Sequence, residues 1–419
     1  IPFHSHSVYN IANHGILELK VGNEVRIQSS LNIRGGILNA YSSLFTSAES
    51  PQGKGDWDEI EVGYSSTSGE ANFWGCTIEY GGHSTISEDY AMITVNRGTA
   101  SFYDNSVIAR SNNAAIRISQ PGNVNLTNTT ITDNTLPVIY AGPGSVVLNG
   151  INNLTGNTDD VMYINFSENN NLFVLDTIDI PYELAGGYTV GSGGTLRIDS
   201  GNVVLMKTHL RISGGTLNAY YSRFTSDQSP KTPGDWDEIE VGYGGNGGEA
   251  NFWGCIIEYG GRSAVSDYYG MVLATSGTTS FYDACLVRRS NNVGVEVTSG
   301  SQVNLSNTTI TENSWPVAYT GAGSLIFNQV NDLTGNTHDG TYILFNSLSG
   351  TFTLDTASVP YVFYSSFTIQ SGATMLIASG NIIKNRSTLY VDGTLIAVAG
   401  VGELIHFTRS EEHTSELQS

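Results

Sequence analysis

The sequence of 419 residues has few of the residues that bind anionic partners or build helices. It contains 18 Lys and Arg against 39 Asp and Glu, a formal net charge of −21. This balance excludes nucleic acid and anionic membrane surfaces as partners, because both require a basic protein surface. Charged residues make up only 14% of the chain, and helix-forming Lys, Glu, Ala and Leu are scarce. Gly, Ser, Thr and Asn are abundant instead, which predicts an all-β protein of short strands and polar turns.

Long apolar runs and cysteines are also rare. No stretch approaches about 18 consecutive apolar residues, so the sequence predicts no membrane insertion. The three cysteines are Cys76, Cys255 and Cys285. The first two hold the same place in two copies of a repeat and are too far apart to pair, whereas Cys255 and Cys285 fall in neighbouring turns. We expect a buried stack of free thiols there, with a disulfide as the alternative.

The chain is organised around one stretch that occurs twice. Gly55–Tyr64 recurs as Gly234–Tyr243, and Gly69–Cys76 recurs as Gly248–Cys255. Both pairs have the same offset (234 − 55 = 179 residues), which continues without a gap from about His14 onward. A long internal repeat of this kind is typical of a solenoid.

The repeat also predicts the domain organisation. We expect residues 1–408 to form a single β-helix made of two copies, at about 14–192 and 193–371, and a partial third copy at 372–408. A solenoid grows along one axis without splitting into domains. The tail 409–419 resembles the in-frame translation of a sequencing adapter, and we exclude it from the expected fold. The chain opens without an initiator Met or signal peptide, so we expect its true start to be absent. An adapter-derived tail implies a gene assembled from environmental or transcriptome reads.

A shorter period lies inside each copy. Successive blocks open on a glycine and continue with alternating apolar residues such as Ala71 and Phe73, which places every second side chain inward. The gaps between these glycines are 33, 29, 24 and 22 residues, and the glycines are Gly36, Gly69, Gly98, Gly122 and Gly144. One block cannot bury its own apolar face, but stacked blocks can. The pattern predicts a right-handed parallel β-helix with rungs of about 22 residues, and loops at 47–54 and 226–233.

Three short motifs carry a family resemblance. Phe45–Ser47, followed by Gly55–Trp57 and Ile78–Gly82, resembles secreted bacterial β-helix repeat proteins of the cell surface. The resemblance covers nearly all of the chain to Thr408. It implies a right-handed parallel β-helix and a secreted or cell-surface location, and it implies no particular reaction. Those proteins usually have small glycines after the Trp, where this chain has Asp58 and Glu59.

The most unusual local feature is an acidic strand around the repeated tryptophan. With Ile60 and Val62 inward, alternation places the tryptophan and two glutamates of each copy on the outward face. A tryptophan beside carboxylates is suited to stack on a sugar ring, and a solvated acidic face is the alternative. The candidate ligand-binding residues are Trp57, Glu59, Glu61, Trp236, Glu238 and Glu240.

The same segment is the candidate metal site. Carboxylates that cluster near a loop can hold Ca²⁺ through their oxygens. The candidate ligands are Asp56, Asp58, Asp235 and Asp237. We expect no cofactor other than calcium, because the eight histidines are scattered and form no pattern with the regularity that zinc requires.

Two motifs raise the alternative of a polysaccharide lyase or glycoside hydrolase. Asn157–Asp160 resembles the paired aspartates of pectin-hydrolysing β-helix enzymes. The second copy has His338 in place of the first of these aspartates, and turn chemistry also explains the motif. Arg110 in one copy, and Arg288 and Arg289 in the other, precede Ser-Asn-Asn and are candidates for a lyase base or exposed turn residues. We therefore predict no catalytic residue.

Asn-X-Ser/Thr triplets recur along the chain. They would carry N-glycans if the source is eukaryotic, and stacked asparagines in turns are the other interpretation. The candidate acceptors are Asn125, Asn128, Asn153, Asn304 and Asn307.

The duplication of 179 residues favours a structural role over an enzymatic one. The role of a scaffold scales with its length, whereas an enzyme needs one site. The sequence therefore favours an extracellular or cell-surface structural or adhesive scaffold that calcium stabilises and that contacts a polysaccharide or cell-surface glycan. The alternatives are a carbohydrate-active enzyme and a non-catalytic carbohydrate-binding module. Terminal rungs also have open strand edges, through which the chain could associate end to end.

Overall fold

The computed structural model describes residues 3–119, 121–261, 269–400 and 402–409. They form short β-strands and one 3₁₀ turn, η1 (Tyr243–Gly245). Contacts between Cα atoms divide the chain into two compact units, unit 1 (Ile1–Ala185) and unit 2 (Gly186–Ser419). Residues 410–419 of the adapter-like tail lie outside the described residues.

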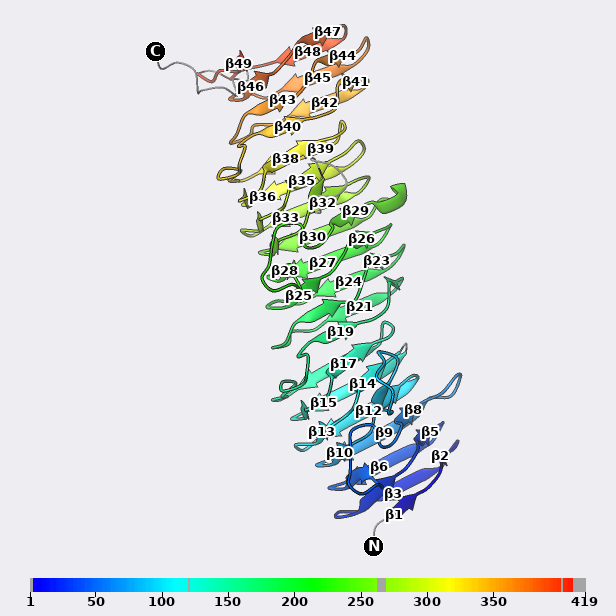
Figure 1. Cartoon of the computed structure of the whole chain (residues 1–419). Coiled ribbons are helices and arrows are strands. Elements are labelled where there is room, and N and C mark those ends of the chain that lie inside the picture. Colours follow the sequence, from blue (N-terminus) through cyan, green and yellow to red (C-terminus); the bar gives the residue numbers. More distant parts are fainter. Residues whose placement is uncertain (1–2, 120, 262–268, 401, 410–419) are drawn as a thin grey trace. The chain divides into compact units, whose positions relative to one another are not determined.

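Unit 1 consists of stacked turns of short strands (Figure 1). Sheet 1A contains β1 (Phe3–Ser5), β4 (Glu24–Ile27), β7 (Leu44–Ser47), β10 (Thr77–Glu79), β13 (Val107–Ala109) and β16 (Thr130–Thr132). Sheet 1B contains β2 (Tyr9–Ile11), β5 (Leu31–Ile33), β8 (Ile60–Val62), β11 (Ala91–Val95), β14 (Ala114–Ile118), β17 (Leu136–Tyr140), β19 (Met162–Ile164) and β22 (Tyr182–Leu184). Sheet 1C contains β3 (Ile16–Leu19), β6 (Ile37–Tyr41), β9 (Gly69–Trp74), β12 (Gly98–Tyr103), β15 (Gly122–Thr127) and β18 (Ser145–Asn149). Outside these sheets lie β20 (Glu168–Asn169) and β21 (Leu172–Leu175).

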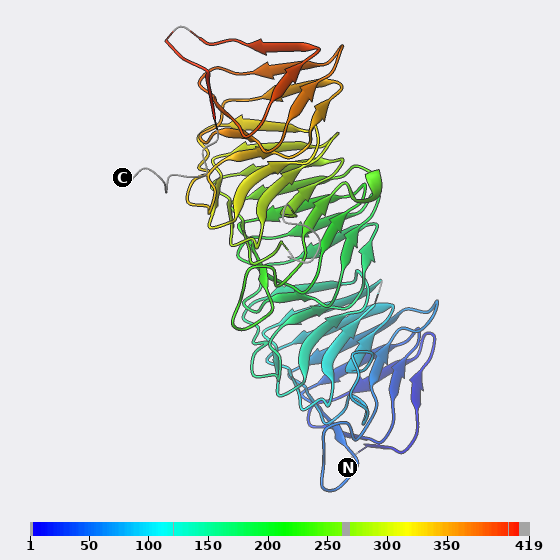
Figure 2. The ribbon, with the colours of Figure 1, turned by 45° about the horizontal axis from the view of Figure 1, so that its top comes forward.

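Unit 2 repeats this plan, and its sheets are named here after their equivalents in unit 1 (Figure 2). Sheet 2A contains β25 (Val203–Met206), β28 (Arg223–Ser226), β31 (Ile256–Glu258), β34 (Leu286–Arg288) and β37 (Thr309–Thr311). Sheet 2B contains β23 (Tyr188–Val190), β26 (Leu210–Ile212), β29 (Ile239–Val241), β32 (Gly270–Ala274), β35 (Val293–Val297), β38 (Trp315–Tyr319), β40 (Thr341–Ile343), β43 (Tyr361–Phe363), β46 (Ile382–Asn385) and β49 (His406–Arg409). Sheet 2C contains β24 (Thr195–Ile198), β27 (Thr216–Tyr220), β30 (Glu249–Trp253), β33 (Thr278–Tyr282), β36 (Gln302–Ser306) and β39 (Ser324–Asn328). Two short sheets follow, sheet 2D with β41 (Ser347–Leu348), β44 (Phe367–Ile369) and β47 (Leu389–Val391), and sheet 2E with β42 (Thr351–Leu354), β45 (Thr374–Ile377) and β48 (Thr394–Ala397).

The strand pairing confirms the predicted fold and rung spacing. Within each unit the named strands pair in parallel with the strand one turn later, consistent with a right-handed parallel β-helix. In sheet 1C, Leu38 lies beside Ala71, Ala71 beside Ala100, Ala100 beside Val124, and Val124 beside Val146. These steps have the 33-, 29-, 24- and 22-residue lengths that the glycine spacing predicts.

The core of each unit is a stack of identical inward positions. Phe73 and Phe102 are fully buried, and their rings stack with centroids 5.0 Å apart. Their equivalents Phe252 and Phe281 stack in the same way at 5.2 Å. Longer rungs bulge outward as loops, and the predicted loop at 47–54 lies between β7 and β8. The repeat therefore builds two rows of buried rings and leaves its extra residues on the surface.

Candidate functional site

The predicted outward position of Trp57 and Trp236 is wrong. Both side chains are 1% exposed. The indole N–H of Trp57 donates to the carbonyl oxygen of Glu79 (3.0 Å), and the ring packs so closely on Gly81 that an added Cβ would lie 2.6 Å from it. The reason is that β8 begins only at Ile60, so strand alternation does not extend back to Trp57. Neither tryptophan can stack on a sugar.

The glutamates of this segment are covered rather than solvated. Glu61 and Glu240 point outward from their strands but are 5% and 9% exposed. Arg34 binds Glu61 (2.8 Å), and Arg211 binds Glu240 (3.2 Å). Glu238 is 1% exposed and also lies beside Arg211. The alternative of a solvated acidic face therefore fails for these three glutamates, whereas Glu59 and the four aspartates are half-buried.

Two of the candidate calcium ligands, Asp56 and Asp235, accept hydrogen bonds from residues of the neighbouring loops. Asp56 accepts hydrogen bonds from the Ser47 hydroxyl (2.6 Å) and the Gly53 N–H (2.7 Å). Asp235 does the same with Ser226 and Thr232, and these bonds outweigh its burial and lower its pKa. The other two candidates also have partners, Asp58 with two serines and Asp237 with a histidine. Among the described residues no group of three or more His, Cys, Asp or Glu is arranged to hold a metal ion, and calcium binding stays a hypothesis.

The arginines considered for a lyase are engaged in ion pairs. Arg110 binds Glu79 (2.6 Å), and Arg289 binds Glu312 (2.6 Å). Both have a left-handed backbone, with φ of 60° and 56°, as expected of turn residues. Arg288 binds the buried carboxylate of Glu258 (2.9 Å). Each of these guanidinium groups is thus held in an ion pair, which does not favour a role as the base of a lyase.

The motif at Asn157–Asp160 forms a turn. The carboxylate of Asp160 accepts from the backbone N–H groups of Gly156 (3.1 Å) and Asn157 (2.9 Å). Burial would raise its pKa, but these hydrogen bonds outweigh burial and lower it. Asp339 accepts in the same way from Asn336 (2.8 Å) in unit 2. The turn interpretation accounts for both copies.

The sequon asparagines also take part in local hydrogen bonds. Asn128 and Asn307 have φ of 51° and 53° and occupy left-handed turn positions. Asn153 accepts from the N–H of Thr155 (3.1 Å). Asn125 and Asn304 project from sheets 1C and 2C and donate to serine hydroxyls one turn earlier. Stacking accounts for Asn125 and Asn304, whereas Asn128, Asn153 and Asn307 are exposed, and glycosylation stays a prediction.

The cysteines confirm the prediction of a free-thiol stack. All three are free and buried. The N–H of Cys255 points at the sulfur of Cys285 (3.4 Å). In unit 1 the equivalent N–H of Cys76 points at the hydroxyl of Ser106 (3.2 Å). Burial raises the pKa of each thiol, to about 12 for Cys255, so the thiols are neutral core groups.

The structure reveals a surface that the sequence analysis missed, an aromatic row on the outward side of sheet 1C. Tyr41, Trp74 and Tyr103 lie on consecutive rungs, with ring centroids 4.7 and 5.5 Å apart. All three side chains are half-buried. The outward positions of β6, β9 and β12 are in register. Aligning the blocks on their first glycine therefore predicts that these three aromatic residues are neighbours.

Unit 2 has the same row at the equivalent positions. Tyr220, Trp253 and Tyr282 stack with centroids 4.7 and 5.4 Å apart and are also half-buried. The rings cover one another's faces and present their edges to solvent. This arrangement gives a continuous apolar strip along the sheet.

An amide row runs beside each aromatic row, two residues earlier on the same strands. Asn72 donates to Asn39 (3.0 Å) in unit 1, and Asn251 donates to Asn218 (3.1 Å) in unit 2. Serines and asparagines continue the row on the next two strands. Asn72, Ser101, Asn251 and Ser280 are only 2–9% exposed, so the half-buried Asn39, Asn125, Asn218 and Asn304 are the members of the row that solvent reaches. We define the binding face of each unit as its aromatic row together with its amide row. Apolar ring edges beside amide and hydroxyl groups are the mixture that sugar rings require.

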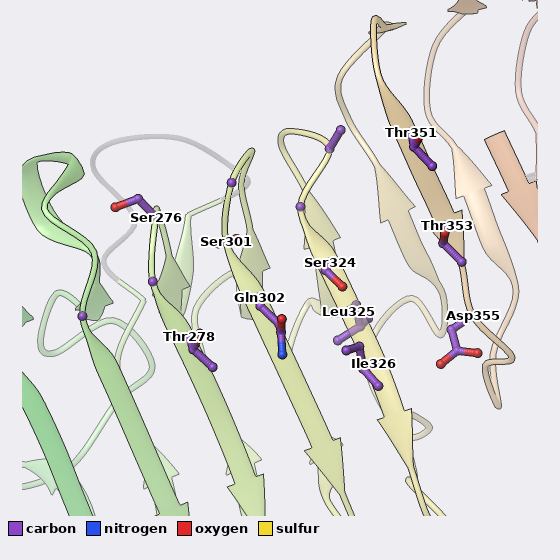
Figure 3. A pocket seen from close by; sticks show the side chains of 15 residues that line it. Ser276, Thr278, Ser301, Gln302, Ser324, Leu325, Ile326, Thr351, Thr353 and Asp355 are labelled. Carbon is purple, nitrogen blue, oxygen red and sulfur yellow. The ribbon is translucent and has the colours of Figure 1, made fainter. Parts of the chain in front are cut away.

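In unit 2 the outward side of sheet 2C is hollowed by a groove of about 890 Å³. Figure 3 shows the side chains of Thr278, Gln302 and Ser324 on neighbouring strands, with those of Thr351 and Thr353 on the strand beyond. The groove therefore adds hydroxyl and amide groups at the side of the binding face away from the aromatic row.

The half-buried carboxyl of Glu59 predicts a local dependence of stability on pH. Burial raises the pKa of Glu59, and repulsion from Glu61 adds to the effect. A carboxyl whose pKa is raised by folding stabilises the protein below its unfolded pKa, and this contribution is lost as the pH rises through its folded pKa. We expect Glu59→Gln to raise the Tm by about 2 °C at about pH 8 and to have little effect near pH 4.

The Tm of the variant and the wild type across this pH range would test the effect. Asp89→Asn is the matched control, because Asp89 is exposed, and we expect no change from it at any pH. Destabilisation by Glu59→Gln at the higher pH would contradict the role of burial.

No family model and no curated protein matches the sequence. One solved structure aligns with 95% of this chain and 96% of its own, the crystal structure of the TibC-catalyzed hyper-glycosylated TibA55-350 fragment. The identity is 11% and the TM-score 0.24. No helix in the described ranges has the length and hydropathy of a membrane span.

Proposed function

We propose that this protein is an extracellular or cell-surface adhesive scaffold that contacts carbohydrate through its two binding faces. The observation that carries the proposal is the repetition of the aromatic row, Tyr41–Trp74–Tyr103 in unit 1 and its equivalent in unit 2, with nearly the same ring spacings. A binding face that occurs in both units would allow the protein to attach to carbohydrate at more than one point. Two weak sites on one chain can hold a polymer far more tightly than either site alone.

The charge of the protein favours one class of glycan. With a formal net charge of −21, the chain repels uronate-rich and sulfated polymers. The described residues of the binding faces contribute hydroxyls, amides and ring edges, with charged groups at their border: Glu70 and Glu249, Glu18 beside Asn39, and Arg197 beside Asn218. We therefore infer that the ligand is a neutral polysaccharide.

Retention on insoluble cellulose, chitin and mixed-linkage glucan would test this function. We expect the wild type to be retained on at least one of them and the double variant Trp74→Ala/Trp253→Ala to bind at least about tenfold more weakly, because the apolar strip of both faces is interrupted. Tyr64→Ala/Tyr243→Ala is the matched control, since these tyrosines are exposed, repeated and outside the faces.

Equal retention of the Trp74→Ala/Trp253→Ala variant and the wild type would contradict the assignment of the binding faces. Release of reducing or unsaturated ends from any of these polymers would instead favour an enzyme.

A further inference from the structure

In unit 2 the polar surface continues along the solenoid beyond the aromatic row. The row occupies β27, β30 and β33, and the groove of about 890 Å³ continues over β36 and β39 to β42 (Figure 3). Successive rungs are about 4.8 Å apart, so the five steps from β27 to β42 span about 24 Å. This length exceeds that of the aromatic row, which covers three rungs.

A chain of side-chain hydrogen bonds joins the groove to the aromatic row. Gln302, which is exposed in the groove, donates to Asn304 of the amide row (2.9 Å). Asn304 in turn donates to Ser280 (2.9 Å), two residues before Tyr282 of the aromatic row. These bonds order the amide groups between the row and the groove before a ligand binds, which lowers the entropic cost of binding.

The lining of the groove combines hydroxyls with an apolar group. Ser324, Thr351 and Thr353 are exposed in it, and Figure 3 shows them together with Ile326, which is half-buried. Hydroxyl groups beside an apolar side chain are the mixture that sugar rings require. The groove therefore offers the same kinds of contact as the binding face that it adjoins.

Among the described residues that line the groove, Asp355 is the one that carries a charge. Its two carboxylate oxygens accept from the backbone N–H groups of Phe327 (3.2 Å) and Thr356 (2.9 Å). The backbone thus holds the carboxylate in place, and its negative charge disfavours an anionic ligand. The groove therefore suits the same neutral class of glycan as the aromatic row.

Unit 1 differs at the equivalent positions of the surface. Leu172 and Val174 replace Thr351 and Thr353, and Leu172 is 62% exposed. These side chains cannot hydrogen-bond to sugar hydroxyls. The aromatic row and the amide row are therefore common to both units, whereas these two hydroxyls belong to unit 2.

We propose that unit 2 binds a longer stretch of a linear neutral polysaccharide than unit 1, with the sugar chain running from the aromatic row into the groove. This inference rests on the proposed carbohydrate function and gives its two binding faces different lengths. Residues of an extended β-linked sugar chain are spaced nearly as the rungs are, so about six of them would reach from Tyr220 to Thr351. Unit 1 would contact about three, one for each ring of its aromatic row.

The length of an oligosaccharide distinguishes the two faces. Trp74→Ala leaves the face of unit 2 intact, and Trp253→Ala leaves that of unit 1. The probes are soluble tri- and hexasaccharides of cellulose, chitin and mixed-linkage glucan, titrated by calorimetry. For at least one polymer we expect Trp74→Ala to bind the hexasaccharide at least about thirtyfold more tightly than the trisaccharide. We expect Trp253→Ala to bind the two within about fivefold, a margin that allows for the several registers of a long chain on a short site.

The residues of unit 1 supply a variant that tests the groove. Thr351→Leu/Thr353→Val introduces the side chains of unit 1 at two exposed positions, so we expect it to fold. In the Trp74→Ala background it should weaken hexasaccharide binding at least about tenfold and leave trisaccharide binding unchanged. Thr394→Leu is the matched control and should change neither, because Thr394 is exposed in the same column of side chains beyond the groove.

The outcomes separate this inference from the proposed function. The same length dependence in both single variants, or full hexasaccharide affinity after Thr351→Leu/Thr353→Val, would overturn the inference and leave the proposed function intact. An equal loss with Thr394→Leu would also overturn it. Should the groove variant fail to fold by circular dichroism, the length dependence decides. Binding of none of these sugars to either single variant would overturn both proposals.

Discussion

Replacement of Trp236 by alanine is expected to lower the free energy of unfolding by about 3–5 kcal/mol. The side chain is 1% exposed and its N–H donates to the Glu258 carbonyl (2.9 Å). Its ring also fills the space above Gly260, where an added Cβ would lie 2.6 Å away. Truncation therefore leaves a large cavity and an unpaired buried carbonyl. Urea unfolding followed by circular dichroism would measure the loss.

Trp253→Ala is the matched control for Trp236→Ala. Trp253 is half-buried and stacks on Tyr220 and Tyr282, and the loss of two such stacks costs about 1–3 kcal/mol. An equal or larger loss for Trp253→Ala than for Trp236→Ala would contradict the assignment of one tryptophan to the core and the other to the surface.

The second large effect is expected at Glu258 in unit 2. Its side chain is fully buried, and its two oxygens bind Arg223 and Arg288. Burial opposes ionisation, but the two guanidinium groups and the hydroxyl of Thr225 outweigh it and lower the pKa of Glu258. Removal of this carboxylate in Glu258→Ala leaves two partly buried cations without their partner. We expect the free energy of unfolding to fall by about 2–3 kcal/mol, because solvent partly screens the two arginines that are left, measured by urea unfolding at pH 7.

Unit 1 provides the internal control for Glu258→Ala. The equivalent Glu79 binds one arginine, Arg110, whose side chain is 46% exposed. We expect Glu79→Ala to cost about 1 kcal/mol. Because the pKa of Glu258 is lowered, its contribution is present above its unfolded pKa and should disappear as the pH falls through the folded value. A Glu258→Ala effect that persists undiminished in acid would contradict this account.

The fold was predictable because each rung has the same pattern, a glycine followed by alternating inward apolar residues. Glycine-led blocks align Ala71, Ala100 and Val124 as inward neighbours, and the structure pairs these residues. The turns were predictable for a similar reason, since asparagines at equal spacing stack, as Asn134 does on Asn157 (3.0 Å). Local periodicity is enough for both features.

The exposure of the tryptophans is not predictable from single strands. Alternation holds only within a strand, and Trp57 precedes the start of β8 at Ile60. Trp74 lies inside β9, where alternation holds, and the registered strands place it between Tyr41 and Tyr103. The row could have been found by aligning whole blocks rather than single strands.

In the described part of the chain β39 and β42 belong to different sheets, which could not be predicted from the sequence. Ser324–Asn328 has the alternation of an ordinary strand, and so has Thr351–Leu354. Whether two such strands pair depends on how the longer rung between them is routed, which is a tertiary property. The hydrogen bond from Phe327 to Asp355 likewise joins residues whose proximity no local pattern indicates.

The measurement that tests the central claim most directly is the stoichiometry of carbohydrate binding. Titration of the wild type by calorimetry, with soluble oligosaccharides of the polymer that retains it, should give two sites per chain. Trp74→Ala and Trp253→Ala should each leave one site, and the double variant none. A single site in the wild type, or two sites in either single variant, would contradict a function based on the duplicated binding faces.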